Sequence, residues 1–184
     1  DAPATGEGRY AMIDGDNDCY VVNASLYTML SVKEESLLPL PDLTGWLSAE
    51  KLMTVTLTQP DRETIAIRRV TESNPFNMVA EMTEPFAYPA NSERTAALFL
   101  ALEAIAPTGI ASRGGETEVD ALLADITLGF EDETHHLTLA RSGDTVLLLV
   151  DDDPAVYTLA EGSEDFLQNA TVAYLAEQLP GLVM

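Results

Sequence analysis

The longest stretch of helical periodicity in the chain runs from Asn91 to Ala106. Its apolar residues recur with the spacing of one helical face: Leu98, Phe99, Leu102 and Ile105. Asn91 can cap the first turn, because its side-chain oxygen can accept a backbone N–H that has no partner inside the helix. Pro107 and Gly109 follow, and both residue types are typical of a helix end. The pattern therefore predicts a helix over about residues 91–106.

Most other apolar residues alternate with polar ones or stand in short β-branched runs, which is typical of strands. In Lys51–Thr58, Leu52 and three threonines occupy one side of the predicted strand, and the other side is apolar: Met53, Val55 and Leu57. In Thr64–Val70, the residues expected to point inward are Ile65, Ile67 and Val70. Further strands are predicted at Arg9–Ile13, Cys19–Asn23, Asn77–Thr83, Gly109–Ser112, Ile126–Phe130, His135–Ala140, Thr145–Val150 and Ala155–Leu159.

The segments between these strands are predicted to be short helices or irregular. Trp46 lies in Leu43–Glu50, which we interpret as a loop or short helix that packs on the core. Pro85 and Pro89 indicate an extended link into the main helix. Val119–Ala124 is expected to be helical or irregular. Short helices are predicted at Ala24–Leu30, Ser163–Asn169 and Thr171–Leu179.

Two alignments of the chain with itself indicate an internal repeat. Tyr10–Asp14 aligns with Leu147–Asp151 without gaps, and Val55–Arg68 aligns with Ile126–Arg141 when gaps are allowed. The predicted fold class is α+β, with antiparallel, hairpin-built sheets in repeated units packed against the central helix at about 91–106. Residues 1–50 would form the C-terminal part of a first α+β unit, and residues 51–184 a second, complete unit. Whether the two share one core is left open.

Composition and charge narrow the range of partners. The chain has 184 residues, of which 46% are apolar, enough for a sizeable core. It carries 31 acidic against 9 basic residues, a net charge of −22. Nucleic-acid backbones and anionic membrane surfaces repel such a polyanion, so neither is an expected partner. The acidic surface either keeps the protein soluble or binds cations or a basic partner.

The cysteine content excludes a disulfide within the chain, and the apolar runs indicate no membrane-spanning helix. Cys19 is the only cysteine, so no disulfide can form within the chain. No apolar run approaches the length of a membrane-spanning helix, so direct membrane insertion by this segment is not expected. The chain starts at Asp1, and its first residues read as a linker. We expect a preceding segment, which would carry the information on location.

Acidic turns are the candidate cation sites. Asp14, Asp16 and Asp18 alternate as the first Ca²⁺ ligands of an EF-hand loop do. The pattern then fails, because Cys19 stands where such a loop needs glycine and Ser25 where it needs glutamate. The second acidic turn contains Asp151 and Asp153. Because Asp is also a favoured turn residue, turn formation explains both clusters, with a cation site as the alternative. No metal site is predicted from them.

No catalytic constellation can be placed on the sequence, so an enzyme is not predicted. His135 and His136 are the only histidines, and as neighbours in a strand they point to opposite faces. They therefore cannot bind one metal ion together. Arg68 and Arg69 form the only basic doublet, and one of the two is expected to face solvent and to pair with surface carboxylates.

Several short motifs together resemble an uncharacterised bacterial family. The motifs are Gly8-Arg9-Tyr10, Cys19-Tyr20-Val21-Val22, Glu84-Pro85, Tyr88-Pro89-Ala90-Asn91 and Val156-Tyr157-Thr158-Leu159. Members of this family are envelope-anchored proteins of unknown function, often found with ABC-transporter components of the gliding-motility auxiliary type. The resemblance implies an extracytoplasmic location and an anchor upstream of Asp1. It implies no catalytic residues.

The sequence therefore predicts a non-catalytic extracytoplasmic interaction or accessory module of an anchored bacterial envelope protein. The expected partner is another envelope protein, and ABC-transporter components are the candidates that the resemblance offers. The alternative is a ligand- or cation-binding module that uses the acidic turns. No cofactor is expected. The identity of the partner or ligand and the oligomeric state stay open at this level.

Overall fold

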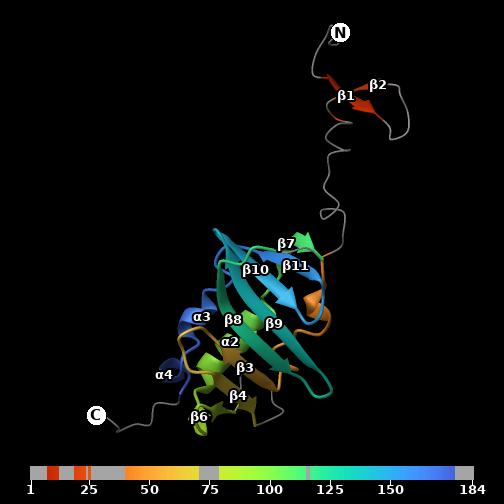
Figure 1. The fold of residues 1–184 in the computed structure, drawn as a ribbon. Helices are drawn as coiled ribbons and strands as arrows, with labels where there is room; N and C mark the ends of the chain where they lie inside the picture. Colours follow the sequence, from red (N-terminus) through yellow and green to blue (C-terminus); the bar gives the residue numbers. More distant parts are fainter. Residues whose placement is uncertain are drawn as a thin grey trace. The chain divides into compact units, whose positions relative to one another are not determined.

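A computed structural model describes residues 8–12, 19–23, 25, 40–70, 79–114 and 117–176. The chain divides into two compact units, residues 1–39 and 40–184. Each unit is described by itself. Figure 1 gives the element labels that are used below.

Unit 1 contains an antiparallel hairpin, formed by β1 (Gly8–Met12) and β2 (Cys19–Asn23). Its register runs from Gly8 opposite Asn23 to Met12 opposite Cys19. The strand pair predicted in this region is therefore confirmed. The connecting acidic turn, residues 13–18, lies outside the described residues. So does the helix predicted over Ala24–Leu30, apart from Ser25.

Unit 2 is built on an antiparallel sheet of nine strands, in the order β6-β5-β4-β3-β8-β9-β10-β11-β7. The strands of its first half are β3 (Thr54–Thr58), β4 (Ile65–Arg69), β5 (Ala80–Glu84) and β6 (Tyr88–Ala90). The strands of its second half are β8 (Ala121–Gly129), β9 (Thr134–Ser142), β10 (Thr145–Val150) and β11 (Ala155–Leu159). The edge strand β7 (Pro107–Arg113) pairs with β11.

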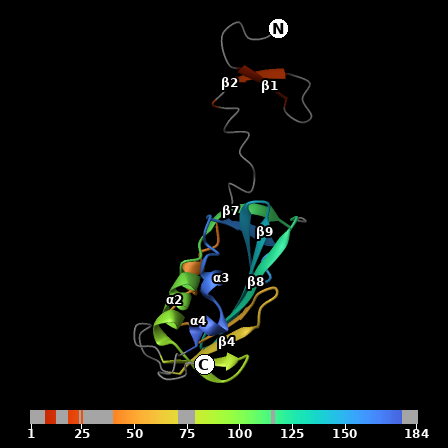
Figure 2. The same ribbon diagram turned by 90° about the vertical axis from the view of Figure 1, so that its left-hand side faces the viewer.

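The sheet consists of two four-stranded meanders that meet where β3 pairs with β8. Helix α2 (Ser92–Glu103) joins β6 to β7, the strands at opposite edges of the sheet. It therefore crosses back over one face, where α3 (Phe166–Asn169) and α4 (Val172–Leu175) also lie (Figure 2). Among the described residues, no helix covers the other face of the sheet.

Alternation along the strands defines the face that packs on the helices. Val55 and Leu57 of β3 are buried, whereas the threonines on the other side of that strand are not, as the pattern predicts. The register continues this face across the meanders, with Val55 opposite both Ile67 and Leu128. Phe99 and Leu102 of α2 are fully buried against it. The core therefore lies between α2 and the sheet.

Helix α2 begins where the sequence predicts. The Asn91 side chain accepts a hydrogen bond from the backbone N–H of Arg94, at 3.0 Å. The backbone N–H of Asn91 donates to the carbonyl of Leu175, which ties the start of α2 to α4. An isolated bridge between Ala90 and Ala176 extends this connection.

The structure corrects the predicted fold class. The chain is predominantly β, with one large antiparallel sheet and few short helices among the described residues, so α+β with repeated units around a central helix is wrong. The predicted helix exists, but it covers a sheet that is continuous from edge to edge. Val119–Ala124 is also corrected, because the long strand β8 begins within it, at Ala121. The extended link between Pro85 and Pro89 contains the short strand β6.

Candidate functional site

The ends of several strands meet at one end of the sheet of unit 2. Because β3 is antiparallel to both β4 and β8, its start lies beside the ends of these two neighbours. The backbone N–H of Met53 donates to the carbonyl of Gly129, and the N–H of Arg69 donates to the carbonyl of Met53, both at 2.8 Å. The hydrogen-bond ladder thereby fixes Met53, Arg69 and the β8–β9 turn beside one another.

The segment before β3 adds an aromatic wall to this end of the sheet. A short 3-10 helix, η2 (Leu43–Gly45), is capped by Asp42, whose carboxylate accepts from the N–H of Thr44 at 3.1 Å. Leu43 and Leu47 are buried in the core and hold the segment down. Between them, Trp46 is only partly buried and lies at the surface of this core.

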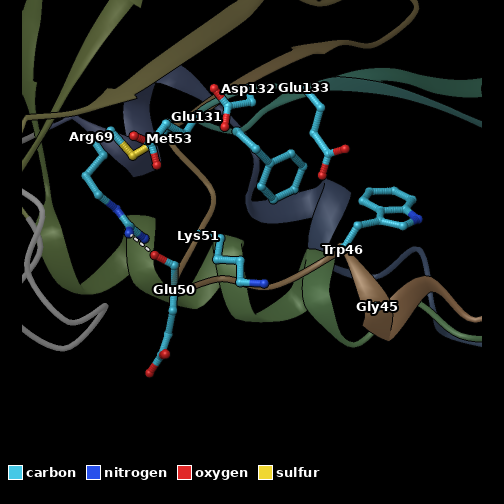
Figure 3. Close-up of a pocket in the computed structure, with 10 residues that line it drawn as sticks. Gly45, Trp46, Glu50, Lys51, Met53, Arg69, Glu131, Asp132 and Glu133 are labelled. Carbon is cyan, nitrogen blue, oxygen red and sulfur yellow. Dashed lines mark hydrogen bonds between the residues drawn. The ribbon is translucent and has the colours of Figure 1, made fainter.

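These elements enclose a pocket of about 510 Å³, within the size range of small-molecule sites. Its lining residues are Gly45, Trp46, Glu50, Lys51, Met53, Arg69, Phe130, Glu131, Asp132 and Glu133. Figure 3 shows Arg69 and Trp46 at opposite ends, with Lys51 between them. The carboxylate of Glu133 points towards Trp46 (Figure 3). The pocket therefore has two chemically different ends.

An aromatic cluster forms the Trp46 end. The rings of Trp46 and His135 are stacked, with centroids 3.8 Å apart and planes inclined by 20°. Phe130 meets both rings edge-on, at 6.0 Å from Trp46 and 5.9 Å from His135. Offset stacking and edge-to-face contacts of this kind stabilise ring positions beyond the area they bury. One face of Trp46 is thus held by His135, at the end where the ring lines the pocket.

Two carboxylates flank His135. Its Nδ1 atom lies 2.7 Å from Oδ2 of Asp151, and its Nε2 atom lies 3.6 Å from Oε2 of Glu133. The other Asp151 oxygen accepts from the backbone N–H of His136, at 2.7 Å. Burial raises the pKa of the Asp151 carboxyl, but the hydrogen bonds from His135 and His136 outweigh it, so the pKa lies below its ordinary value.

Asp151 owes this position to its backbone. Its φ of 47° lies in the left-handed region, where Asp is tolerated better than most residues. Its own N–H donates to the carbonyl of His136 at 2.8 Å. These hydrogen bonds attach the turn after β10 to the start of β9. The Asp151 carboxylate thereby fixes the His135 ring against Trp46.

Arg69 is a buried cation on the pocket wall. Its side chain is only 3% exposed, and its guanidinium donates to the backbone carbonyls of Ala49 and Glu50. Its Cζ atom lies 5.6 Å from the centre of the Phe99 ring. No carboxylate among the described residues lies within ion-pair distance of it, and its Nε–H has no acceptor. Burial lowers its pKa, against a smaller opposing effect of the Glu50 carboxylate.

Of the two acidic turns that were candidate cation sites, only the second lies among the described residues. Asp14, Asp16 and Asp18 lie outside the described residues. Asp151 binds His135 and His136, as above. Asp153 accepts from the N–H of Ala155 at 2.9 Å and from the hydroxyl of Tyr157 at 2.5 Å. Among the described residues, no group of three or more His, Cys, Asp or Glu side chains is placed to hold a metal ion.

The other residues singled out from the sequence can also be placed. Arg68 is exposed and forms an ion pair with Glu81, which confirms the prediction for the basic doublet. His136 is exposed and contacts Thr127 on the outer face of the sheet, whereas His135 lies on the core face. The inward position predicted for Val70 is wrong, because Val70 is 55% exposed and Arg69 takes the buried place.

The sequence contains a signal for one residue that lines the pocket and for one residue that packs behind Trp46, although neither was predicted to belong to a site. Arg69 continues the inward row of Ile65 and Ile67, and His135 begins the row of Leu137 and Leu139. The signal in both strands is a polar residue at the end of a series of inward-facing apolar residues. Lys51 and the acidic β8–β9 turn gave no such signal.

Comparisons of the chain with protein-family models, with curated proteins and with solved structures gave no match.

Proposed function

We propose that this chain is a non-catalytic binding module and that the pocket between Trp46 and Arg69 is its ligand site. The observation that carries the proposal is the pocket itself, with an aromatic wall and charged groups in a cavity of about 510 Å³. Its walls come from strand ends that backbone hydrogen bonds hold in place, so the cavity is formed before any ligand arrives. This pocket, and not the acidic turns, is therefore the ligand site that we propose.

The cellular setting of the module is proposed from the family resemblance alone. Following it, the module is the extracytoplasmic part of an anchored bacterial envelope protein that acts with a protein partner in the envelope, with ABC-transporter components as the first candidates. Within the described part of the chain, no helix combines the length and apolar content needed to cross a membrane.

Trp46 allows the binding function to be tested without a label. It is the only tryptophan of the chain and lines the pocket, so a bound ligand should change the fluorescence of the protein. We would screen a library of metabolites and peptides for compounds that change this fluorescence and also raise the melting temperature. The expected result is a class of compounds that does both.

Gly45 provides a matched pair of variants for the same screen. A Cβ atom at Gly45 meets no atom within 4 Å, so the position accepts a side chain. Gly45→Phe should fill the pocket and abolish the response, whereas Gly45→Ala should leave it unchanged. A screen without any response, or with responses that Gly45→Phe does not affect, would refute the proposed site.

The envelope location calls for a separate experiment. The complete gene product would be followed by fractionation of its native host, with known cytoplasmic and envelope proteins as markers. The proposal expects it in the envelope fraction and accessible to added protease in cells with a permeabilised outer layer. Recovery from the cytoplasmic fraction would contradict the location but not the binding function.

A further inference from the structure

We infer that the pocket binds a linear zwitterion, with a carboxylate at the Arg69 end and an ammonium group at the Trp46 end. Amino acids with a basic side chain and short peptides share this chemistry. The inference rests on the proposed binding function and names its ligand class.

Arg69 keeps one hydrogen-bond donor that an anionic ligand would satisfy. A buried cation is stable only when opposite charge or hydrogen-bond acceptors replace the water that it has lost. Two backbone carbonyls accept from the terminal nitrogens of Arg69, but the Nε–H has no acceptor, and the effect of the Glu50 carboxylate on Arg69 is smaller than that of burial. A carboxylate can accept from Nε–H and an adjacent terminal N–H at once, which is the usual geometry of arginine recognition. Lys51, between Arg69 and Trp46, is the second cation of the pocket (Figure 3).

The rest of the pocket rejects a ligand that carries only negative charge. Four carboxylates line it, on Glu50, Glu131, Asp132 and Glu133, against the two cations. The chain as a whole has a net charge of −22, so a free anion is also repelled during its approach. A carboxylate ligand of Arg69 is therefore favoured when it belongs to a molecule that also carries positive charge.

The Trp46 end is suited to that positive charge. An ammonium group over the face of a tryptophan is attracted by the ring, and a nearby carboxylate adds to the attraction. Glu133 points towards Trp46 in Figure 3, and its side chain is 56% exposed, so a ligand can reach it. Because Arg69 and Trp46 lie at opposite ends, the two charges must stand at opposite ends of the ligand.

Three probes of equal chain length test the charge requirement. The zwitterion ε-aminocaproate has both charges, hexylamine has only the cation, and caproate has only the anion. Each would be titrated into the full chain, with the fluorescence of Trp46 and calorimetry as readouts. The expected result is that ε-aminocaproate binds at least tenfold more tightly than either analogue. L-lysine and triglycine, titrated in the same way, distinguish an amino acid from a peptide as the source of the zwitterion.

Arg69 and Arg68 provide a matched pair of variants. Both substitutions, Arg69→Gln and Arg68→Gln, remove one charge from the same strand, but Arg68 is exposed, pairs with Glu81 and does not line the pocket. Arg69→Gln should abolish the preference for ε-aminocaproate over hexylamine, and Arg68→Gln should preserve it. If Arg69→Gln does not fold, the exposed Lys51→Gln replaces it and should reduce that preference severalfold.

The outcomes separate this inference from the binding function beneath it. If other compounds bind in a manner that Gly45→Phe abolishes, while the zwitterion shows no advantage over its analogues, the ligand class is wrong and the binding function stands. An advantage that survives Arg69→Gln would likewise overturn the assignment of the carboxylate to Arg69. If no compound of any class responds, both are refuted.

Discussion

Tyr157 illustrates how single polar residues hold the turns of this sheet. Its ring is buried in the core, and its hydroxyl donates to the carboxylate of Asp153, which also accepts from the N–H of Ala155. The hydrogen bond from Tyr157, followed by that from Ala155, lowers the pKa of Asp153. Burial, with the nearby carboxylate of Asp153, raises the pKa of Tyr157 to about 12. The two residues thus fix the start of β11 to the turn that precedes it.

Tyr157→Phe should destabilise unit 2 by about 1–3 kcal/mol at neutral pH, because it leaves Asp153 without a charge-assisted hydrogen bond. The variant should also change the response to alkali. The pKa of Tyr157 is about 10 in the unfolded chain and about 12 in the folded chain. Ionisation of Tyr157 therefore favours the unfolded chain, and the free energy of unfolding falls as the pH rises between those values. Urea denaturation of both proteins at pH 7, 10 and 11 would measure this. Parallel losses in the two proteins would show that Tyr157 does not contribute.

At the level of residues, the sequence predicts which positions face the core better than it predicts what those positions do. Alternation placed Val55 and Leu57 inward correctly. The same alternation puts the members of each pair, Arg68 with Arg69 and His135 with His136, on opposite faces, but it does not identify which member faces the core, where charged or titratable residues are rare. Arg69 is tolerated there because carbonyls of a turn far away in the sequence accept its N–H groups. Such partners cannot be seen before the fold is known.

Among the elements, α2 depends on a cap that the sequence does reveal. Asn91→Ala should lower the stability of unit 2 by about 1 kcal/mol, because the N–H of Arg94 loses its acceptor at the start of the helix. Asn91→Ser keeps a capping oxygen and should be close to the original protein. Thermal unfolding followed by circular dichroism would compare the three. Equal melting temperatures for Asn91→Ala and Asn91→Ser would contradict a capping role.

The pairing of β3 with β8 depends on the absence of a side chain at Gly129. A Cβ atom there would lie 2.2 Å from Oγ1 of Thr54 on the neighbouring strand. Gly129→Ala should therefore destabilise the protein by about 1–3 kcal/mol through overpacking. The additional change Thr54→Ala removes the clashing atom, so the double variant should be more stable than the sum of the single effects predicts. Additive losses in denaturant titrations would refute this explanation.

Long elements with a clear period were predicted well, and irregular ones were not. The main helix and the strands β9, β10 and β11 lie within a few residues of their predicted positions. Val119–Ala124 was misassigned because three small or acidic residues interrupt its apolar pattern, whereas pairing with β9 makes it a strand from Ala121 onwards. Tertiary hydrogen bonding decides such segments, and local propensity does not.

At the scale of the whole molecule, the net charge of −22 should make stability dependent on salt. Repulsion between like charges disfavours the compact state, and the screening length shrinks from about 30 Å at 0.01 M to about 8 Å at 0.15 M salt. We expect the melting temperature to rise over this range of sodium chloride. Calcium chloride at equal ionic strength should have a similar effect. A much larger rise with calcium would show a specific cation site and would return attention to the acidic turns.

The fold class could not be predicted correctly because it depends on how hairpins join. Every hairpin is a local feature, and the sequence places most of them. The ladder between Thr54–Thr58 and Asp125–Gly129 joins segments far apart in the chain, and it turns two meanders into one sheet. No pattern within either segment shows that the two pair with each other.

The position of β7 has a consequence for how the chain could be divided. β7 belongs by sequence to the first half of unit 2, yet it pairs with β11 at the far edge of the second meander. A chain cut between β7 and β8 would give one fragment with both outer strands of the sheet and another with the four strands between β3 and β7. Reassembly would then require the second fragment to insert into the first along two separate ladders. Unit 2 is therefore a natural scaffold for fragment complementation, in which two co-expressed pieces restore one protein only when they interlock.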